Sequence, residues 1–437
     1  MPQHYDLIVA GGGPSGMLAA GFAASEGLHV LLAEKMPRPG RKIAITGKGR
    51  CNLTNLTSTE HFLAEVNANA MFLKPVIENF TPEKTVAFFN SMGVRTVTER
   101  GHRVFPASGK AFDIVDALVN WCNKNKVHIL TSCQVTGLLI KDKSIEGITC
   151  SLKGKICEFH APMVLLCTGG KSYPATGATG DGYELAEKSG HQIVKPFQSL
   201  VPLEPNKKIP GSLHTLILKN IEARLTYNGK VLVKQFGEMN FAGGFLSGPV
   251  VLTLSRTANE YLLKGQKITI AIDLKPALSV EKLKNRINRD INSSQGITVK
   301  KLLSGLLPSA MIEFCIQACG LNQQSSAGKL SEDQKLQLVH WLKNVEFEIR
   351  KARPWEEAII TAGGIDVKDI DQTNLASKKI NGLFFAGEII DIDANTGGYN
   401  LQIAFSTGKY ASDAIIKKWK GSSFQSTNNV KKPIFEA

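Results

Sequence analysis

The sequence predicts an α/β fold: a Rossmann-like domain with a parallel sheet, interrupted by an inserted module. Residues 5–35 read as strand, glycine-rich turn, helix, strand and acid. Later apolar runs at 163–167 and 382–386 have the length of buried strands, and glycine follows each within two residues. Between them, from about residue 196 to 350, the pattern changes to alternating strands and then to helices. Strand–helix alternation on both sides of a differently patterned segment indicates one domain split by another.

The first stretch, Asp6 to Glu34, has the features of a dinucleotide-binding unit. Gly11 permits a tight turn, Gly13 lets the backbone approach a pyrophosphate, and Gly16 lets the helix pack on the strand. The helix N-terminus then offers free N–H groups and a positive dipole end. An acid at position 34 suits a ribose without a 2′-phosphate. The alternative is a glycine turn that binds nothing. The expected nucleotide contacts are Gly11, Gly13, Pro14, Ser15, Gly16, Glu34 and Lys35.

The next segment, Arg38 to Asn55, is too rich in glycine and polar residues to predict a helix or a strand. We expect a loop of hydrogen-bond donors, and its place directly after the ribose acid favours contacts with a cofactor. The alternative is an exposed basic loop. Cys51 is a lone thiol and is expected to fill space rather than to carry redox chemistry. The expected cofactor contacts are Arg41, Thr46, Gly49, Arg50, Cys51 and Asn52.

Helices are expected over 72–92, with a helix start at Thr81–Pro82, and over 112–123. A strand is expected at 127–130, followed by an edge segment in which Val135 is a candidate contact for an adenine. Residues 144–158 alternate like the two strands of a hairpin.

The run 163–167 is expected to be a buried parallel strand whose end lies on the cofactor. Phosphates and a ribityl chain would pass the residues that follow it, which are Thr168, Gly169 and Gly170. Further on, Asp181 is expected to cap a helix over 182–189.

The inserted segment is expected to be part β and part α. Residues 213–256 are strand-like with a tight turn at Tyr227–Lys230, and 268–274 add a strand. Helices are expected over 280–291, 299–318 and 331–342. The first domain is then expected to resume with strands at 358–362 and 382–388, a loop to 398, and a helix from Tyr399 to Ala414.

These late segments predict which dinucleotide binds. A dehydrogenase that uses only a nicotinamide does not need a second strand–Gly–Glu–helix unit to complete its site. A protein that binds a longer cofactor does need one. Gly387 would let the backbone approach the pyrophosphate, and Glu388 would accept from a ribityl hydroxyl. The N–H groups of Asn400 and Leu401 would stabilise negative charge on a reduced flavin ring. The predicted cofactor is FAD, with NAD(P)H as a transient electron donor.

The chain resembles the bacterial FAD-dependent oxidoreductases of the aminoacetone-oxidase-like and dehydro-bile-acid-reductase-like type, within the glutathione-reductase-type FAD group. The resemblance covers nearly the whole chain, in runs that include Gly40–Lys42, Gly49–Asn55, Arg103–Pro106, Thr168–Gly170, Thr179–Tyr183, Ser247–Pro249 and Thr396–Gln402. It implies an FAD domain split by a β-barrel and a helical domain. The implied ranges are 1–195 and 351–420 for the FAD domain, 196–275 for the barrel and 276–350 for the helices, with a disordered tail at 421–437.

Two positions depart from the family pattern. Lys48 stands where the family usually has Gly, and Ala242–Gly243 stand where it often has Thr-His. The first change would place a cation near the flavin or a phosphate. The second removes a substrate or acid/base contact, so no relative's substrate can be carried over from the resemblance.

Composition sets further expectations. The 437 residues are 43% hydrophobic and 21% charged, which is typical of a globular protein of two or three domains. No apolar run approaches the ~20 residues that span a bilayer, so no membrane partner is expected. The eight cysteines include no CxxC pair and no metal ligand set, and we expect a cytoplasmic protein with no metal site. The net charge of +14 is spread along the chain, so a nucleic-acid partner is not expected.

The function predicted from these observations is an FAD-dependent oxidoreductase. Hydride would pass from NAD(P)H through flavin N5 to an unsaturated small-molecule substrate. Tyr399 is the candidate proton donor, although a packing role for it is favoured. The alternatives are an oxidase for an amine-type substrate, a flavoprotein associated with tRNA, and a flavin-binding sensor without turnover.

Overall fold

The computed structural model describes residues 3–293 and 296–428. The chain forms two compact units, one from the residues up to 197 together with those from 360 onward, and one from residues 198–359. Each unit has its own hydrophobic core. The predicted fold class, a Rossmann-like domain split by a β-barrel and helical module, is confirmed.

The centre of the first unit is a five-stranded parallel sheet. Four of its strands are short apolar runs that are buried almost throughout, as expected for a parallel sheet covered on both faces, whereas the edge strand 128–131 is partly exposed. In spatial order they are β20 (Leu383–Phe385), β11 (Val164–Leu166), β2 (Leu7–Ala10), β3 (Val30–Glu34) and β7 (His128–Thr131). Because all five run parallel, the glycine-containing segments after β2, β11 and β20 leave the sheet at the same edge, where such folds bind nucleotides.

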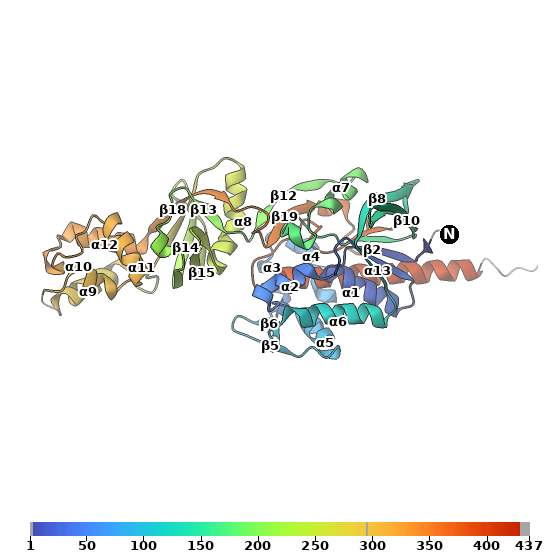
Figure 1. The fold of residues 1–437 in the computed structure, drawn as a ribbon, viewed down its shortest axis with the longest axis horizontal. Helices are drawn as coiled ribbons and strands as arrows, with labels where there is room; N and C mark the ends of the chain where they lie inside the picture. The colour runs from blue at the N-terminus through green and yellow to red at the C-terminus, as the bar shows by residue number, and fades with distance from the viewer. Residues whose placement is uncertain (1–2, 294–295, 429–437) are drawn as a thin grey trace, which may run out of the picture. The chain divides into compact units, whose positions relative to one another are not determined.

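Two helices from opposite ends of the sequence pack together beside this sheet: α1 (Pro14–Ser25) and α13 (Tyr399–Asn428) (Figure 1). A Cβ placed on Gly408 of α13 would lie 2.5 Å from the main-chain oxygen of Ser15, so only glycine permits this approach. The expected tail begins at residue 421, but α13 continues to Asn428. The sequence from Tyr399 to residue 432 contains no proline, and extending an established helix costs little. The rest of the expected tail, 429–437, lies outside the described residues.

Smaller elements complete this unit. The segment 38–55, expected to be a loop, contains a short helix, a 3-10 turn and a strand. The reason is local: five residues without glycine, 41–45, lie between glycines that take positive φ angles. The helices are α2 (Arg41–Ile45), η1 (Thr46–Gly49), α3 (Thr59–Ala64), α4 (Ala70–Asn79), α5 (Pro82–Ser91), α6 (Ala111–Lys124), η2 (Pro174–Thr176), α7 (Asp181–Lys188) and η5 (Val367–Asp369).

Three small sheets surround the central one. The first has the order β1 (Gln3–His4), β10 (Lys155–His160), β9 (Ser144–Leu152), β8 (Cys133–Lys141), and it contains the predicted hairpin. The second pairs β12 (Ile193–Ser199) with β19 (Ile360–Ile365). The third has the order β4 (Thr54–Asn55), β6 (Arg103–Pro106), β5 (Thr96–Thr98).

The second unit contains a closed barrel. Its strands, in spatial order, are β13 (Leu203–Pro205), β16 (Phe245–Ser247), β15 (Lys230–Ala242), β14 (Ile217–Tyr227), β17 (Ile268–Asp273) and β18 (Val345–Ala352). The implied barrel range of 196–275 is therefore too short, because β18 comes after the helices and closes the barrel. Residues 249–256, predicted as strand-like, begin helix α8 (Pro249–Leu263). Proline at the first helical position and buried residues at helical spacing favour that helix.

Apart from α8, the longer helices of this unit lie together on one side of the barrel strands (Figure 1). They are α9 (Val280–Asn292), α10 (Val299–Ser304), α11 (Ser309–Ala318) and α12 (Glu332–Lys343), with the short η4 (Ala327–Lys329). The short η3 (Gly211–Leu213) contacts α11. The single helix expected over 299–318 is divided before Ser309, where Pro308 cannot continue a helix. Within the described parts of the chain, no helix is long and apolar enough to cross a membrane.

Candidate functional site

The glycine turn between β2 and α1 forms the centre of the site. Gly11 has φ 111°, and a Cβ there would lie 2.4 Å from the oxygen of Cys167. A Cβ on Gly16 would lie 2.0 Å from the oxygen of Gly11, so the helix packs directly on the turn. Gly13 is different, because no atom lies within 4 Å of the place its Cβ would take. The space before the first turn of α1 is therefore open, and the free N–H groups there suit a pyrophosphate.

Glu34 ends β3 and faces this turn. Its carboxylate accepts hydrogen bonds from the N–H groups of Gly12 and Met36, both at 2.7 Å. Burial raises the pKa of Glu34, and the two backbone hydrogen bonds oppose that rise. The carboxylate is thus fixed where β3 ends, in the position that a ribose hydroxyl would need.

Lys35, a predicted nucleotide contact, is held by Asp181 at 2.8 Å. Asp181 does not cap a helix as predicted: Gly180 is the N-cap residue of α7, and no side chain caps it. The Asp181 carboxylate instead accepts from Lys35, Thr179 and Gln134. Burial works against ionisation of Asp181, but these donors outweigh it and the pKa is lowered.

The segment after β11 adds an unsatisfied polar group. The hydroxyl of Thr168 is buried and has no hydrogen-bond partner. Gly182 lies so close that a Cβ there would be 1.9 Å from this hydroxyl. A Cβ on Gly170 would likewise lie 2.3 Å from the hydroxyl of Thr361. Buried hydroxyl groups normally have a hydrogen-bond partner. An unpaired one at the carboxyl edge of the sheet therefore indicates a binding site for a polar ligand.

The segment after β20 meets the start of α1. The N–H of Gly387 donates to Thr407 at 2.9 Å, and a Cβ on Gly387 would lie 2.5 Å from the hydroxyl of Ser15. The carboxylate of Glu388 forms an ion pair with Lys42 at 2.6 Å. It also accepts from the N–H of Thr361 at 2.8 Å and from the hydroxyl of Ser172 at 3.0 Å.

Sequence reasoning missed Lys42, Ser172 and Thr361 as site residues. Lys42 stands in one of the runs that carry the family resemblance, which was the only available signal. Its partner Glu388 is 346 positions away, so no spacing rule could have joined them.

The other end of the site lies where β4, η1 and the start of α13 meet. A Cβ on Gly398 would lie 2.5 Å from the oxygen of Thr54 and 3.0 Å from the side-chain oxygen of Asn52. That Asn52 oxygen is buried without a partner, a second orphaned group. The side chain of Asn400 bonds both main-chain groups of Ala394, at 2.7 and 2.9 Å. The helix start is thereby fixed, and its first N–H groups have no partner within the helix.

Cys51 and Tyr399 are buried at this end of the site. Cys51 is fully buried, and burial raises the pKa of its thiol to about 12. Tyr399 is 6% exposed and packs edge-on against Phe62, with 5.1 Å between ring centroids. Burial, with a smaller contribution from Glu65, raises the pKa of Tyr399 to about 12. Both environments favour packing over proton or redox chemistry.

The remaining predicted contacts are less closely tied to the site. Arg50 is exposed, pairs with Glu99 and covers the ring of Phe105. Arg41 is exposed, whereas the hydroxyl of Thr46 donates to the oxygen of Ile43 at 2.7 Å. Of the other predicted contacts, Pro14 and Ser15 begin α1, and Gly49 ends η1. Leu401 lies in the first turn of α13, Val135 in β8, and Gly169 in the turn after β11.

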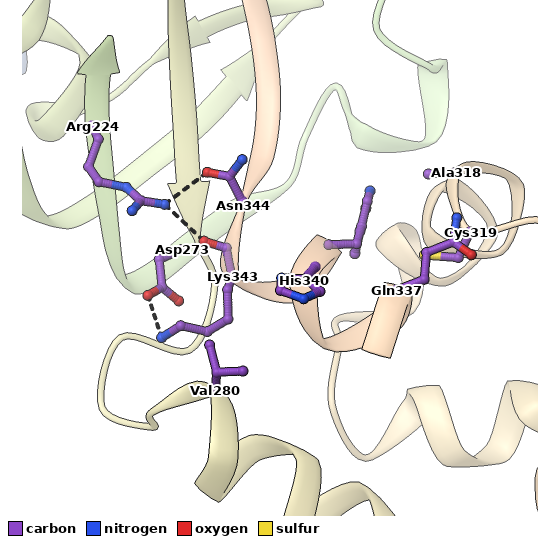
Figure 2. Close-up of a pocket in the computed structure, with 10 residues that line it drawn as sticks. Arg224, Asp273, Val280, Ala318, Cys319, Gln337, His340, Lys343 and Asn344 are labelled. Atoms are coloured by element: carbon purple, nitrogen blue, oxygen red, sulfur yellow. Dashed lines mark hydrogen bonds and ion pairs between the residues drawn. The ribbon is translucent and has the colours of Figure 1, made fainter. Parts of the chain in front are cut away.

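A separate cavity of about 540 Å³ lies within the second unit and contains none of the predicted site residues. Figure 2 shows the Arg224 guanidinium bonded to Asn344 and to the main chain of Lys343. Lys343 also pairs with Asp273 at 2.5 Å. The charged groups of this cavity mainly satisfy one another.

The site is built from both ends of a Rossmann-like domain, and its glycine turn and strand-end acid define a nucleotide-binding protein of the α/β class. The chain belongs to the HI0933-like family, because the HI0933-like protein Rossmann domain matches residues 5–414. The resemblance predicted from the sequence is thus confirmed, and the family and fold support FAD as the cofactor.

Relatives of two kinds match along almost their whole length. A 3-dehydro-bile acid delta(4,6)-reductase from Clostridium scindens is 29% identical over 415 residues, which cover 94% of this chain and 98% of the relative. A ribosomal RNA dihydrouridine synthase from Escherichia coli is 29% identical over 419 residues, covering 95% and 99%. Among solved structures, a 3-ketosteroid delta1-dehydrogenase from Sterolibacterium denitrificans has a TM-score of 0.56 at 15% identity, covering 95% of this chain and 100% of that one. This last similarity shows the fold alone.

Proposed function

We propose that this protein is an FAD-dependent reductase that takes hydride from NAD(P)H and saturates a carbon–carbon double bond conjugated to a carbonyl group. The observation that carries the proposal is the full-length similarity to two kinds of reductase. A dehydro-bile acid reductase and a dihydrouridine synthase differ in substrate, but each name describes hydrogen added across such a bond. The shared chemistry is what this chain is proposed to retain.

The residues that would hold the cofactor follow from the geometry. The open space at Gly13 and the first turn of α1 would receive the pyrophosphate, with Glu34 at the ribose. The orphaned oxygens of Thr168 and Asn52 would gain hydrogen-bond partners from the bound molecule. The positive end of α13 would face the part of the ring that becomes negative on reduction. FAD, when bound, supplies the two-electron carrier between donor and acceptor.

A second candidate keeps the chemistry and changes the acceptor from a small molecule to a uridine in RNA. The E. coli relative is a ribosomal RNA dihydrouridine synthase, and this chain carries a net charge of +14. A nucleic-acid partner was not expected from the sequence, since its lysines and arginines are dispersed. In the fold, several exposed arginines and lysines lie on the hairpin of β5 and β6 and on η1.

Anaerobic stopped-flow spectroscopy tests the reductase proposal. NADH or NADPH is expected to bleach the flavin absorbance of the holoprotein. A conjugated enone steroid or an unmodified ribosomal RNA transcript is then expected to restore the absorbance. Failure of both nicotinamides to bleach the flavin would overturn the proposal. Reduction by an amine, followed by rapid reoxidation by oxygen alone, would replace it with an oxidase.

A further inference from the structure

The hairpin formed by β5 and β6 carries a group of exposed basic residues. Arg95, Arg100 and Arg103 lie along this hairpin, and Lys48 and Arg50 come from η1 and the residue after it. We call these five residues the basic face. Glu99 is the one acid in the segments 36–56 and 95–110, and it pairs with Arg50. No ion pair among the described residues involves the other four, so their charges are available to a partner.

The phenylalanine at position 105 organises this face. The guanidinium carbons of Arg50 and Arg103 lie 4.3 and 6.0 Å from the centre of its ring. Strand pairing places Arg103 opposite Glu99 and Phe105 opposite Val97, so these side chains share one face of the hairpin. A guanidinium group held over an aromatic ring can donate hydrogen bonds to a phosphate, and its planar face can stack on a nucleic-acid base.

The basic face adjoins the start of α13 at the candidate flavin site. The side-chain nitrogen of Asn55 donates to the oxygen of Gly101 in the hairpin turn at 3.0 Å and to that of Gly397 at 3.1 Å. β4 also pairs with β6, with Asn55 opposite Arg103. A molecule bound on the basic face would therefore lie next to the first turn of α13.

We propose that the basic face binds the phosphate backbone of an RNA and presents a uridine of that RNA at the flavin, an inference that rests on the proposed reductase function. The basic side chains are exposed and come from separate segments rather than converging on one buried point. This arrangement suits a chain of phosphates better than a single carboxylate. Such contacts fix the register of an RNA without reading its sequence.

The test compares two double variants of the holoprotein, which change the net charge equally. R100E/R103E alters the basic face, and K141E/K155E alters two exposed lysines in the β8–β9–β10 sheet. Binding of an unmodified ribosomal RNA transcript is measured by filter binding across a series of salt concentrations. Removing two phosphate contacts is expected to weaken binding at least about tenfold at about 0.1 M salt, and to lower the salt slope by about 1.4. K141E/K155E is expected to bind like the wild type.

Further readouts separate this inference from the function on which it rests. Flavin bleaching by the nicotinamide is expected to be unchanged in both variants. The thermal midpoint of R100E/R103E is expected to fall only slightly, because the substitution at Arg103 sets a second carboxylate opposite Glu99. Equal loss of RNA binding in both would show that only net charge matters, and would overturn the inference. The wild-type protein could be reduced by NAD(P)H and reoxidised by an enone and still fail to bind the transcript. That result would overturn the proposed RNA-binding surface and leave the reductase function in place.

Discussion

The ion pair between Lys42 and Glu388 joins the two sequence-distant parts of the site, and Lys42→Met is predicted to destabilise the first unit. The side chains are 22% and 17% exposed, so water screens the pair only partly. The lysine nitrogen lies 2.6 Å from Glu388 and 2.6 Å from Ser172. Losing hydrogen bonds to a charged group usually costs about 1.5–3 kcal/mol, and we expect about 2 kcal/mol here because Thr361 and Ser172 still donate to Glu388.

Urea unfolding of the cofactor-free protein measures this loss. A cost of about 2 kcal/mol corresponds to a fall of about 4–8 °C in the thermal midpoint of a domain of this size. The double-mutant cycle with Glu388→Gln is expected to give a coupling energy of at least about 1 kcal/mol. Lys74→Met is the matched control, because Lys74 and Glu78 are 3.9 Å apart and 47% and 52% exposed. That control is expected to change stability by less than about 0.5 kcal/mol. Strictly additive effects of the two substitutions at Lys42 and Glu388 would refute the reasoning.

Three further predictions concern single side chains. Gly13→Ala is expected to leave the unfolding of the cofactor-free protein unchanged but to weaken FAD binding about tenfold, or about 1.4 kcal/mol, because the methyl group enters the open space before α1. Gly211→Ala, which also meets no atom, is the control, and an unchanged FAD affinity in Gly13→Ala would contradict the assignment. Tyr399→Phe is expected to retain at least about half of the rate of flavin reoxidation by substrate, since its phenol is buried and its pKa is raised to about 12; a loss of about a hundredfold would restore it as the proton donor. The Cys51 thiol has a pKa of about 12 and is protonated below that pH, so iodoacetamide at about pH 8 is expected to leave it unmodified in mass spectrometry, and rapid alkylation there would contradict its burial.

The features predicted well from the sequence are those with local causes. The turn after β2 follows from Gly11 and Gly16, where an added Cβ would lie only 2.4 and 2.0 Å from main-chain oxygens. The start of α13 at Tyr399 follows from a loop rich in glycine that ends in a run typical of a helix. In such cases neighbouring residues impose the conformation, and a single sequence contains the information.

The features that could not be predicted depend on residues distant in the sequence. Aspartate is a residue type that often caps helices, but the carboxylate of Asp181 accepts a hydrogen bond from Lys35, 146 positions earlier in the sequence. The barrel closes through β18, which follows the helices, because β13 and β17 pair with it from opposite sides. The basic face likewise joins η1 to a hairpin about fifty residues away. Tertiary contacts outweigh local preference at each of these places.

The central claim is that FAD binds between the glycine turn of α1 and the first turn of α13. Titration of cofactor-free protein with FAD, followed by quenching of flavin fluorescence, tests it directly, with the Gly13→Ala variant measured in parallel. We predict a saturable equimolar complex for the wild type and about tenfold weaker binding for the variant. A wild-type protein that leaves the flavin fluorescence unchanged at every concentration would contradict the account.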